Sequence, residues 1–244
     1  MWLTKMQPEV HFLAERRCYQ AILLGSPEQI GGRQFGRIQI RTARNRTGLI
    51  GLLLGLLLAL APGTSWAAHP ALEACLGFDR TACDEVLKAE PDNLTALFMR
   101  GLAAELAGDD QAALIDFDAT ATREPRHFGA QLWRVIAAKA VGQDRTLELK
   151  AYLDSAKQLS PWPRVLAELY LGSAKPEAVL AAAAGQPATA AAEAVCAAEY
   201  HVGRFHQLAG DKEAAKAHFA ASLATGAAHV FEYQAAKRAL AGLP

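Results

Sequence analysis

The sequence predicts an all-α protein built from repeated helical hairpins. Two stretches about 100 residues apart carry the same residue types at the same offsets: a glycine, a second glycine at +7, an alanine at +12 and a phenylalanine at +16. The region from 68 to 244 is rich in alanine and leucine and shows no strand pattern. Residues repeated at fixed offsets are typical of helical-repeat proteins, which present surfaces for binding. The two sets are Gly101, Gly108, Ala113, Phe117 and Gly203, Gly210, Ala215, Phe219.

The front of the chain differs in composition from the rest. Residues 1–67 carry a net charge of +5 and residues 68–244 a net charge of −5, although the whole chain sums to zero. Residues 1–46 show no repeat and little periodicity, so we expect an over-extended or disordered segment that contains the true start codon. The acidic remainder lacks a basic footprint, so we expect no nucleic-acid partner.

Residues 47–67 have the pattern of a secretory signal peptide. Arg44 and Arg46 precede an apolar run over residues 47–61, and Ser65-Trp66-Ala67 then offers a cleavage site of the small-x-small type. The run is shorter than the ~20 residues that a membrane-spanning helix needs. We therefore expect cleavage after Ala67 and a periplasmic or exported protein. Retention of the segment as an inner-membrane anchor is the alternative.

Residues 68–92 are predicted to form a short helical hairpin that holds two cysteines. Cys75 and Cys83 lie eight residues apart. We expect them on a helix over 71–76 and a second over 82–89, with Thr81 as the N-cap of the second. In an oxidising compartment they are expected to form a disulfide; the alternative is that both are small buried apolar residues. Cys196 has no evident partner and is expected to pack inside the helical core.

Residues 93–244 are predicted to hold the repeats, and the first, over 94–127, has the clearest pattern. Two helices that cross closely need a small residue at the crossing, so Gly101 is expected to face Ala113, with Phe117 filling the space beside it. Gly108 and the following aspartates end one helix and cap the next. Pro125 stops the second helix. In a frame of 34 residues this pattern resembles the tetratricopeptide repeat, a pair of antiparallel helices.

The frame returns twice along the chain. Residues 196–229 repeat the two glycines, the alanine and the phenylalanine, with Gly226 expected to stop the second helix. The unit from 128 to about 161 keeps a turn at Gly142 but has Val135 where the first glycine should lie. Generic alanine-rich amphipathic helices are the alternative explanation for all three units.

The segment between the middle and last repeats turns at two prolines. Pro161-Trp162-Pro163 is expected to precede a helix over 164–171, and Pro176 to begin another, because proline is favoured in the first helical turn. This Trp-Pro turn, the Leu169-Tyr170-Leu171-Gly172 helix end and the closing run from Thr225 to Tyr233 resemble the NlpI-like tetratricopeptide proteins of bacterial envelopes. The resemblance covers about residues 90–242.

That resemblance implies an adaptor. The best-studied member of the family is a lipoprotein that links a carboxy-terminal-processing protease to a peptidoglycan endopeptidase, so a role alongside cell-wall enzymes is implied here. Leu72-Glu73-Ala74-Cys75 is only loosely similar to a lipid-attachment site, with a charge in it. We therefore expect a protein without this anchor.

No motif for catalysis, a metal or a cofactor appears in the sequence. His201 and His206 are five residues apart and so lack the i, i+4 spacing of a helical metal site. We expect no enzyme and no cofactor. The alternative is a subunit of an envelope hydrolase, which would require these histidines and a carboxylate to meet in one pocket.

A protein or peptide partner is expected in a concave groove lined by the first helix of each hairpin. Tyr200 is the expected aromatic anchor, and Arg204 or Lys139 would hold a carboxylate. Alternatively, Phe98 and Tyr200 only pack between neighbouring repeats. The chain could also form a homodimer through its alanine-rich helices or the segment 231–240. The predicted groove residues are Phe98, Leu102, Glu105, Ile136, Lys139, Tyr200, Arg204 and Gln207.

Overall fold

The computed structural model describes residues 70–243, and these residues form eleven α-helices and no strand. The prediction of an all-α fold is confirmed. The segments 1–46 and 47–67, with the predicted signal peptide and Cys18, lie outside the described residues. The helices are α3 (Pro70–Leu76), α4 (Arg80–Ala89), α5 (Leu94–Ala107), α6 (Asp110–Arg123), α7 (Phe128–Ala140), α8 (Thr146–Ser155), α9 (Pro161–Leu171), α10 (Pro176–Ala184), α11 (Ala191–Leu208), α12 (Lys212–Ala224) and α13 (Phe231–Gly242).

The cysteine hairpin forms as α3 and α4, and Cys75 and Cys83 are joined by a disulfide with both side chains fully buried. This prediction is confirmed. The cap of α4 was wrongly predicted: the side chain of Asp79 accepts a hydrogen bond from the Ala82 N–H at 3.1 Å, and Thr81 lies inside the helix. Aspartate is a better N-cap than threonine, so the helix starts two residues earlier than expected.

The two hairpins that carry the repeated pattern, α5–α6 and α11–α12, share one local geometry. A Cβ atom added to Gly101 would lie 2.6 Å from Cε1 of Phe117, and one added to Gly203 would lie 2.7 Å from Cδ1 of Phe219. Each glycine therefore meets the ring itself, where the sequence had suggested that Gly101 faces the alanine. The repeat in the sequence is thus a repeat in three dimensions.

The same two hairpins turn in the same way. Gly108 and Gly210 have φ angles of 73° and 82°, a left-handed conformation that glycine adopts without strain. In each turn the next residue, Asp109 or Asp211, accepts a hydrogen bond at 3.1 Å from the backbone N–H three residues later. These turns and caps follow the prediction, because they depend on residues close together in the sequence.

Helices α7 to α10 connect the two hairpins. The helix after the Trp-Pro turn begins at Pro161, three residues before the predicted start, because a first helical turn accepts proline at more than one position. Cys196 is free and fully buried, as expected, with its sulfur 3.3 Å from the Ser222 hydroxyl. Within residues 70–243 no helix has the length and apolar character needed to cross a membrane.

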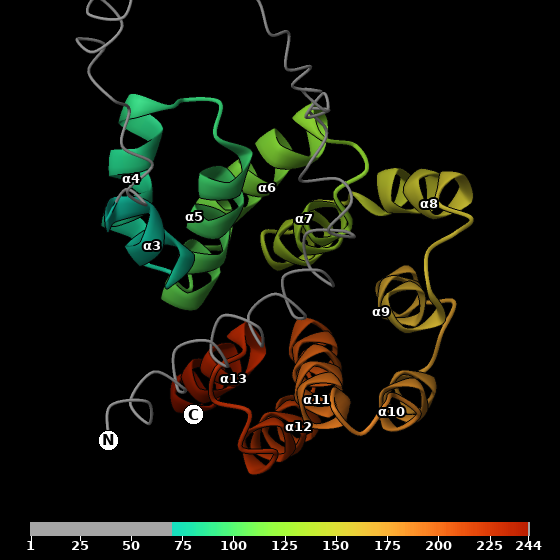
Figure 1. The fold of residues 1–244 in the computed structure, drawn as a ribbon. Helices are drawn as coiled ribbons and strands as arrows, with labels where there is room; N and C mark the ends of the chain where they lie inside the picture. Colours follow the sequence, from blue (N-terminus) through green and yellow to red (C-terminus); the bar gives the residue numbers. More distant parts are fainter. Residues whose placement is uncertain (1–69, 244) are drawn as a thin grey trace, which may run out of the picture.

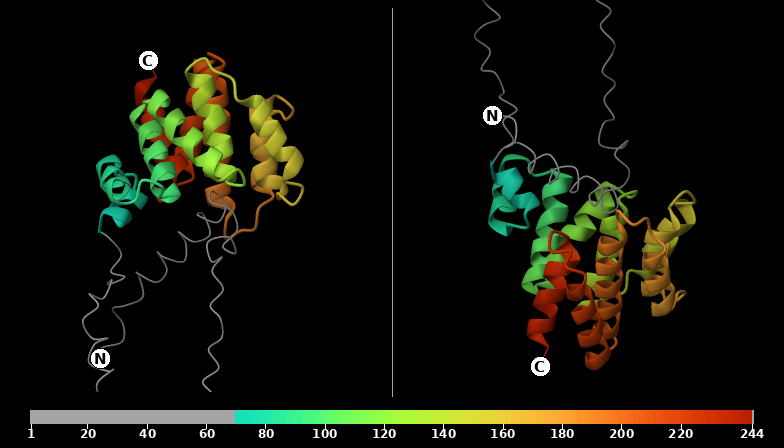
Figure 2. Two further views of the ribbon diagram at one scale, coloured as in Figure 1. Left: turned by 90° about the horizontal axis from the view of Figure 1, so that it is seen from above. Right: turned by 60° about the horizontal axis from the view of Figure 1, so that its bottom comes forward.

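The chain turns back, so that its last helix, α13, packs against α5 from the first half of the described chain. Figures 1 and 2 place α3–α4 at one end and α8–α10 at the other, with α5–α7 and α11–α13 between them. α13 contacts both α5 and α11. The indole of Trp133, on α7, lies 6.0 Å from the Tyr200 ring and 5.2 Å from the Phe231 ring, centroid to centroid. This aromatic cluster fills the centre of the fold.

Candidate functional site

Three of the predicted groove residues lie in the core. Phe98, Leu102 and Ile136 are at most 1% exposed. Because α11 and α13 pack back towards α5 and α7, the inner face of the hairpins is covered by other helices of the same chain. These side chains are therefore not available to line an open groove. This arrangement corresponds to the alternative in which they pack between neighbouring helices.

Four other predicted residues do come together. Glu105, Tyr200, Arg204 and Gln207 line one cavity of about 230 Å³ between α5, α11 and α13. Arg204 Nη2 lies 2.6 Å from Asp110 Oδ1 and 3.1 Å from Glu105 Oε1. Its Nη1 donates to the Gln207 side-chain oxygen at 2.9 Å. The tyrosine is buried, and its hydroxyl is 3.4 Å from the Glu105 carboxylate.

The electrostatics of this cluster indicate a structural role. Burial raises the pKa of Glu105 to about 7, although Arg204 opposes this rise. Burial alone would lower the pKa of Arg204. The groups beside it, Glu105, Tyr200 and Asp110, outweigh this effect and raise the pKa above its ordinary value. Arg204 is thus held by groups of its own chain, and its hydrogen bond to Asp110 links two residues that are 94 positions apart in the sequence. We interpret the cluster as the contact that holds the α5–α6 hairpin against the α11–α12 hairpin.

The remaining predicted residue lies apart from this cluster. Lys139 is exposed in the last turn of α7, and it lines neither this cavity nor the groove described next. The sequence had grouped it with Arg204 because both occupy comparable positions in a repeat frame. The closed packing separates them.

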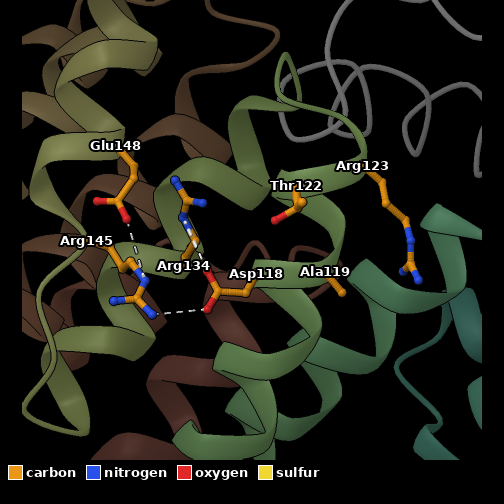
Figure 3. Close-up of a pocket in the computed structure, with 7 residues that line it drawn as sticks. All are labelled: Asp118, Ala119, Thr122, Arg123, Arg134, Arg145 and Glu148. Atoms are coloured by element: carbon orange, nitrogen blue, oxygen red, sulfur yellow. Dashed lines mark ion pairs between the residues drawn. The ribbon is translucent and has the colours of Figure 1, made fainter.

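A second hollow lies on the outer surface, between α6, α7 and the start of α8. It has a volume of about 550 Å³, and we call it the arginine groove (Figure 3). Figure 3 shows Arg134 and Arg145 converging on Asp118, with Arg123 standing apart beyond Thr122 and Ala119. The groove is lined by Asp118, Ala119, Thr122, Arg123, Arg134, Arg145 and Glu148.

The guanidinium groups of this groove are loosely paired. Arg134 Nε is 3.7 Å and Arg145 Nη2 is 3.5 Å from the same carboxylate, that of Asp118. Arg145 Nε is 3.8 Å from Glu148 Oε1, and Arg123 Nη2 is 3.6 Å from Asp92 Oδ1. All four distances exceed those of a charge-assisted hydrogen bond. Within residues 70–243, none of the three arginines donates a hydrogen bond to a carboxylate.

The most buried of these arginines, Arg134, is only partly satisfied: its Nη2 donates a hydrogen bond to Gln131 Oε1 at 2.7 Å. The Arg134 side chain is 9% exposed, and its Nε is buried without a hydrogen-bond partner among the described residues. Burial lowers its pKa, and the nearby positive charge of Arg145 lowers it further, while Asp118 and Glu148 oppose the change. The positively charged guanidinium groups of Arg134 and Arg145 therefore repel each other. Between them lies a single carboxylate of the groove lining, that of Asp118.

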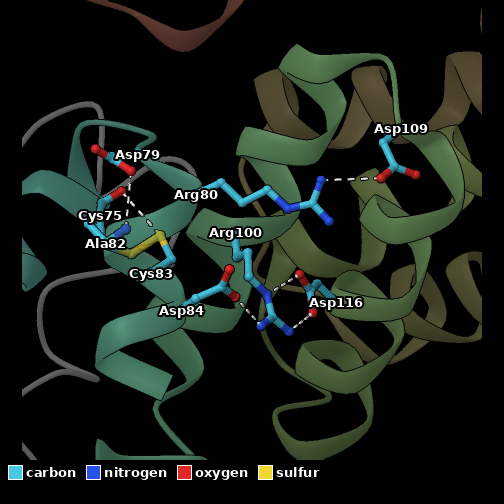
Figure 4. A network of polar contacts seen from close by, with 9 residues as sticks. All are labelled: Cys75, Asp79, Arg80, Ala82, Cys83, Asp84, Arg100, Asp109 and Asp116. Atoms are coloured by element: carbon cyan, nitrogen blue, oxygen red, sulfur yellow. Dashed lines mark hydrogen bonds and ion pairs between the residues drawn. A yellow bond between two sulfur atoms is a disulfide. The ribbon is translucent and has the colours of Figure 1, made fainter. Parts of the chain in front are cut away.

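Arg100, at the contact between α4, α5 and α6, provides a comparison, because it is an arginine with a structural role in the same protein (Figure 4). Its Nε and Nη2 donate to the two oxygens of Asp116 at 2.8 and 2.7 Å, and its Nη1 donates to Asp84 at 2.7 Å. Each of the three guanidinium nitrogens thus has a directed carboxylate partner, and the contact with Asp116 is bidentate. The contrast indicates that the arginine groove retains donors that the fold itself does not use.

Two large apolar side chains are exposed on helices that form the arginine groove, Ile115 on α6 and Leu147 on α8. Ile115 is 60% and Leu147 is 79% exposed, and they are the exposed large hydrophobic residues of the described chain. Ile115 lies one helical turn before Asp118 and Ala119, so it shares their side of α6. Leu147 lies between Arg145 and Glu148 in sequence. No sequence motif marks this groove, because its arginines come from three separate elements.

The histidines do not meet in one pocket. His201 is buried, with Nε2 3.7 Å from Glu232 Oε1, whereas His206 is part-exposed, stacks on the ring of His218 and lies 3.6 Å from Asp211. Burial lowers the pKa of His201 to about 3 and raises that of Glu232 to about 8. Their contact at neutral pH is thus between a neutral imidazole and a protonated carboxyl group. In the described part of the chain, no cluster of His, Cys, Asp and Glu could hold a metal ion.

No protein-family model matches this chain, and no curated protein matches it.

Proposed function

We propose that this protein is an exported helical-repeat scaffold of the bacterial envelope, which binds a protein partner in the arginine groove. The observation that carries the proposal is the set of guanidinium groups without directed carboxylate partners, together with the exposed Ile115 and Leu147 on helices that form the groove. Protein interfaces are enriched in arginine, and exposed apolar surface rimmed by polar residues marks interaction sites. A surface with both features is suited to a protein partner.

The proposal assigns α5–α6 and α11–α12 to tetratricopeptide-type hairpins. The support is the matched contact of Gly101 with Phe117 and of Gly203 with Phe219, together with the matched turns. In such proteins each hairpin is a rigid unit, and binding surfaces are made by helices from neighbouring units. The arginine groove has this character, because it draws on α6, α7 and the residue before α8.

Export is proposed on two independent grounds. The first is the predicted signal peptide at 47–67. The second is the Cys75–Cys83 disulfide, since disulfides persist in oxidising compartments and are rare in the cytosol. N-terminal sequencing of the protein from fractionated cells tests this point: a first residue at Ala68 is expected, whereas a full-length chain in the inner membrane would favour the anchored alternative.

Site-specific photo-crosslinking tests the binding role. A crosslinking amino acid replaces Thr122, which lines the groove, and in a second strain replaces Glu213, which is exposed on α12 away from the groove. A partner protein is expected to be captured from position 122 and not from 213. The identified partner is then purified and its binding to the full-length protein is measured. Equal capture from both positions, or no binding by the purified pair, would refute the proposal.

A further inference from the structure

We propose that the partner presents an acidic peptide segment, whose carboxylates bind Arg134 and Arg145 at one side of the arginine groove and Arg123 at the other. This inference rests on the proposed function and names the chemical class of the segment that the groove receives. The geometry of the guanidinium groups, the local charge and the flanking apolar residues each point to that class.

The guanidinium geometry leaves room for a further anion. Asp118 lies between Arg134 and Arg145 at 3.7 and 3.5 Å, so one carboxylate is shared by two cations and bonds neither of them closely. Arg134 Nε is buried and has no hydrogen-bond partner among the residues that the structure describes. Arg134 Nη2 donates to the Gln131 side chain and Arg145 Nη1 donates to the Asp144 carbonyl oxygen. A carboxylate entering the hollow would accept hydrogen bonds from the remaining N–H groups and relieve the repulsion between the two guanidiniums.

The local charge favours an acidic ligand. The groove holds three arginines against the carboxylates of Asp118 and Glu148, so its net charge is positive. The region 68–244 as a whole carries a net charge of −5. An acidic segment is therefore attracted to this groove and repelled by most of the remaining surface, which favours one docking position.

The surroundings favour a peptide over a small anion. A hollow of about 550 Å³ accepts several side chains, far more than one phosphate ion would fill. Ile115 on α6 and Leu147 on α8, two helices that form the groove, are 60% and 79% exposed. A peptide that alternates acidic and apolar residues could use both kinds of contact, whereas an inorganic anion could use only the arginines.

The test is a binding titration with a defined probe. A fluorescently labelled peptide, Leu-Glu-Asp-Leu-Glu-Leu with blocked ends, is titrated with the full-length protein, alongside its uncharged counterpart Leu-Gln-Asn-Leu-Gln-Leu. Arg145→Gln and Arg123→Gln remove charge from the two sides of the groove. Arg126→Gln is the matched control, because Arg126 is exposed and does not line the groove. Inorganic phosphate is added as a competitor.

The expected result is binding of the acidic probe alone. Each groove variant is expected to weaken it about tenfold, the typical loss for one charge-assisted contact, while Arg126→Gln leaves it within twofold. Binding should also weaken between 0.05 and 0.5 M salt, as expected for part-exposed charges. Urea unfolding of each variant shows whether the fold is retained.

Several results would overturn the inference. Equal binding of both probes would mean that the carboxylates are not recognised, and equal losses in Arg126→Gln would mean non-specific charge attraction. Complete displacement of the probe by inorganic phosphate at matched concentration would indicate a small-anion site. If a partner is captured at position 122 and binds when purified, but the acidic probe does not bind, this inference fails while the proposed function stands. If the captured partner is a second copy of this chain, the groove is a self-association surface and the inference also fails.

Discussion

Substitution of Gly101 by alanine should destabilise the protein, although alanine is the better helix former. The new methyl group would lie 2.6 Å from Cε1 and 2.9 Å from Cδ1 of the fully buried Phe117 ring. Overpacking costs about 1–3 kcal/mol, and a contact this short with a fully buried ring belongs to the upper part of that range, about 2–3 kcal/mol. The gain in helix propensity returns about 1 kcal/mol. The free energy of unfolding should therefore fall by about 1–2 kcal/mol. For a domain of this size the corresponding fall in Tm is about 2–8 °C.

The second hairpin allows the same overpacking cost to be measured at Gly203. A methyl group on Gly203 would lie 2.7 Å from the Phe219 ring and 3.3 Å from the carbonyl oxygen of Ala215. Because a backbone atom is also close, relief by ring movement alone is less complete, and the loss should equal or exceed that at Gly101. Gly242→Ala is the control, since nothing lies within 4 Å of a methyl group there.

The assay is urea unfolding followed by circular dichroism, with the free energy of unfolding extrapolated to water. Gly101→Ala and Gly203→Ala should both be less stable than wild type, and Gly242→Ala should lie within about 0.5 kcal/mol of it. In Gly101→Ala/Phe117→Leu, the smaller side chain should make the combined loss smaller than the sum of the two single losses. If Gly101→Ala is as stable as wild type, the close contact that defines the repeated hairpin is refuted.

Three further predictions concern stability. Cys75→Ala/Cys83→Ala should lower the free energy of unfolding by about 2.5 kcal/mol, and a reductant should do the same to wild type but not to the variant. Arg204→Met leaves two carboxylates unpaired, one of them buried, and should cost about 3 kcal/mol in urea unfolding; a loss below 0.5 kcal/mol would contradict its closing role. Burial raises the pKa of Glu232 in the folded state to about 8, above its unfolded value, so wild type loses stability as pH rises from about 4.5 to 8. Glu232→Gln removes that loss, so its stability relative to wild type should increase over this range; a constant difference would show that Glu232 does not titrate there.

The sequence predicts those parts of the fold that depend on residues close together in the chain. The turns at Gly108 and Gly210 need a left-handed residue followed by a capping aspartate, and in both turns two consecutive residues meet these requirements. The disulfide joins residues only eight positions apart. Even here the predicted cap of α4 is two residues too late, because both Asp79 and Thr81 are suitable caps and the prediction took threonine, the weaker of the two.

The closure of the fold could not be read from local pattern. A repeat frame gives the direction of each side chain relative to its own hairpin, and on that basis Phe98 and Ile136 were placed on an inner groove. It does not show whether the hairpins leave that groove open. The answer depends on contacts between distant elements, such as Tyr200 with Glu105 and Trp133 with Phe231. These contacts convert predicted groove residues into core.

The closed packing also determines where a partner can bind. An open array would offer its inner face, and the predicted residues were chosen for that face. Here the inner arginine, Arg204, already bonds Asp110 at 2.6 Å, so a partner could reach it only by breaking the contact that closes the fold. Arg145, on the outer side, uses Nη1 to bond the Asp144 carbonyl oxygen, and its Nη2 and Nε have no carboxylate closer than 3.5 Å. A ligand can therefore accept hydrogen bonds from Nη2 and Nε without breaking a contact that closes the fold. Binding at the arginine groove is therefore compatible with the stability of the fold, and binding at the predicted inner groove is not.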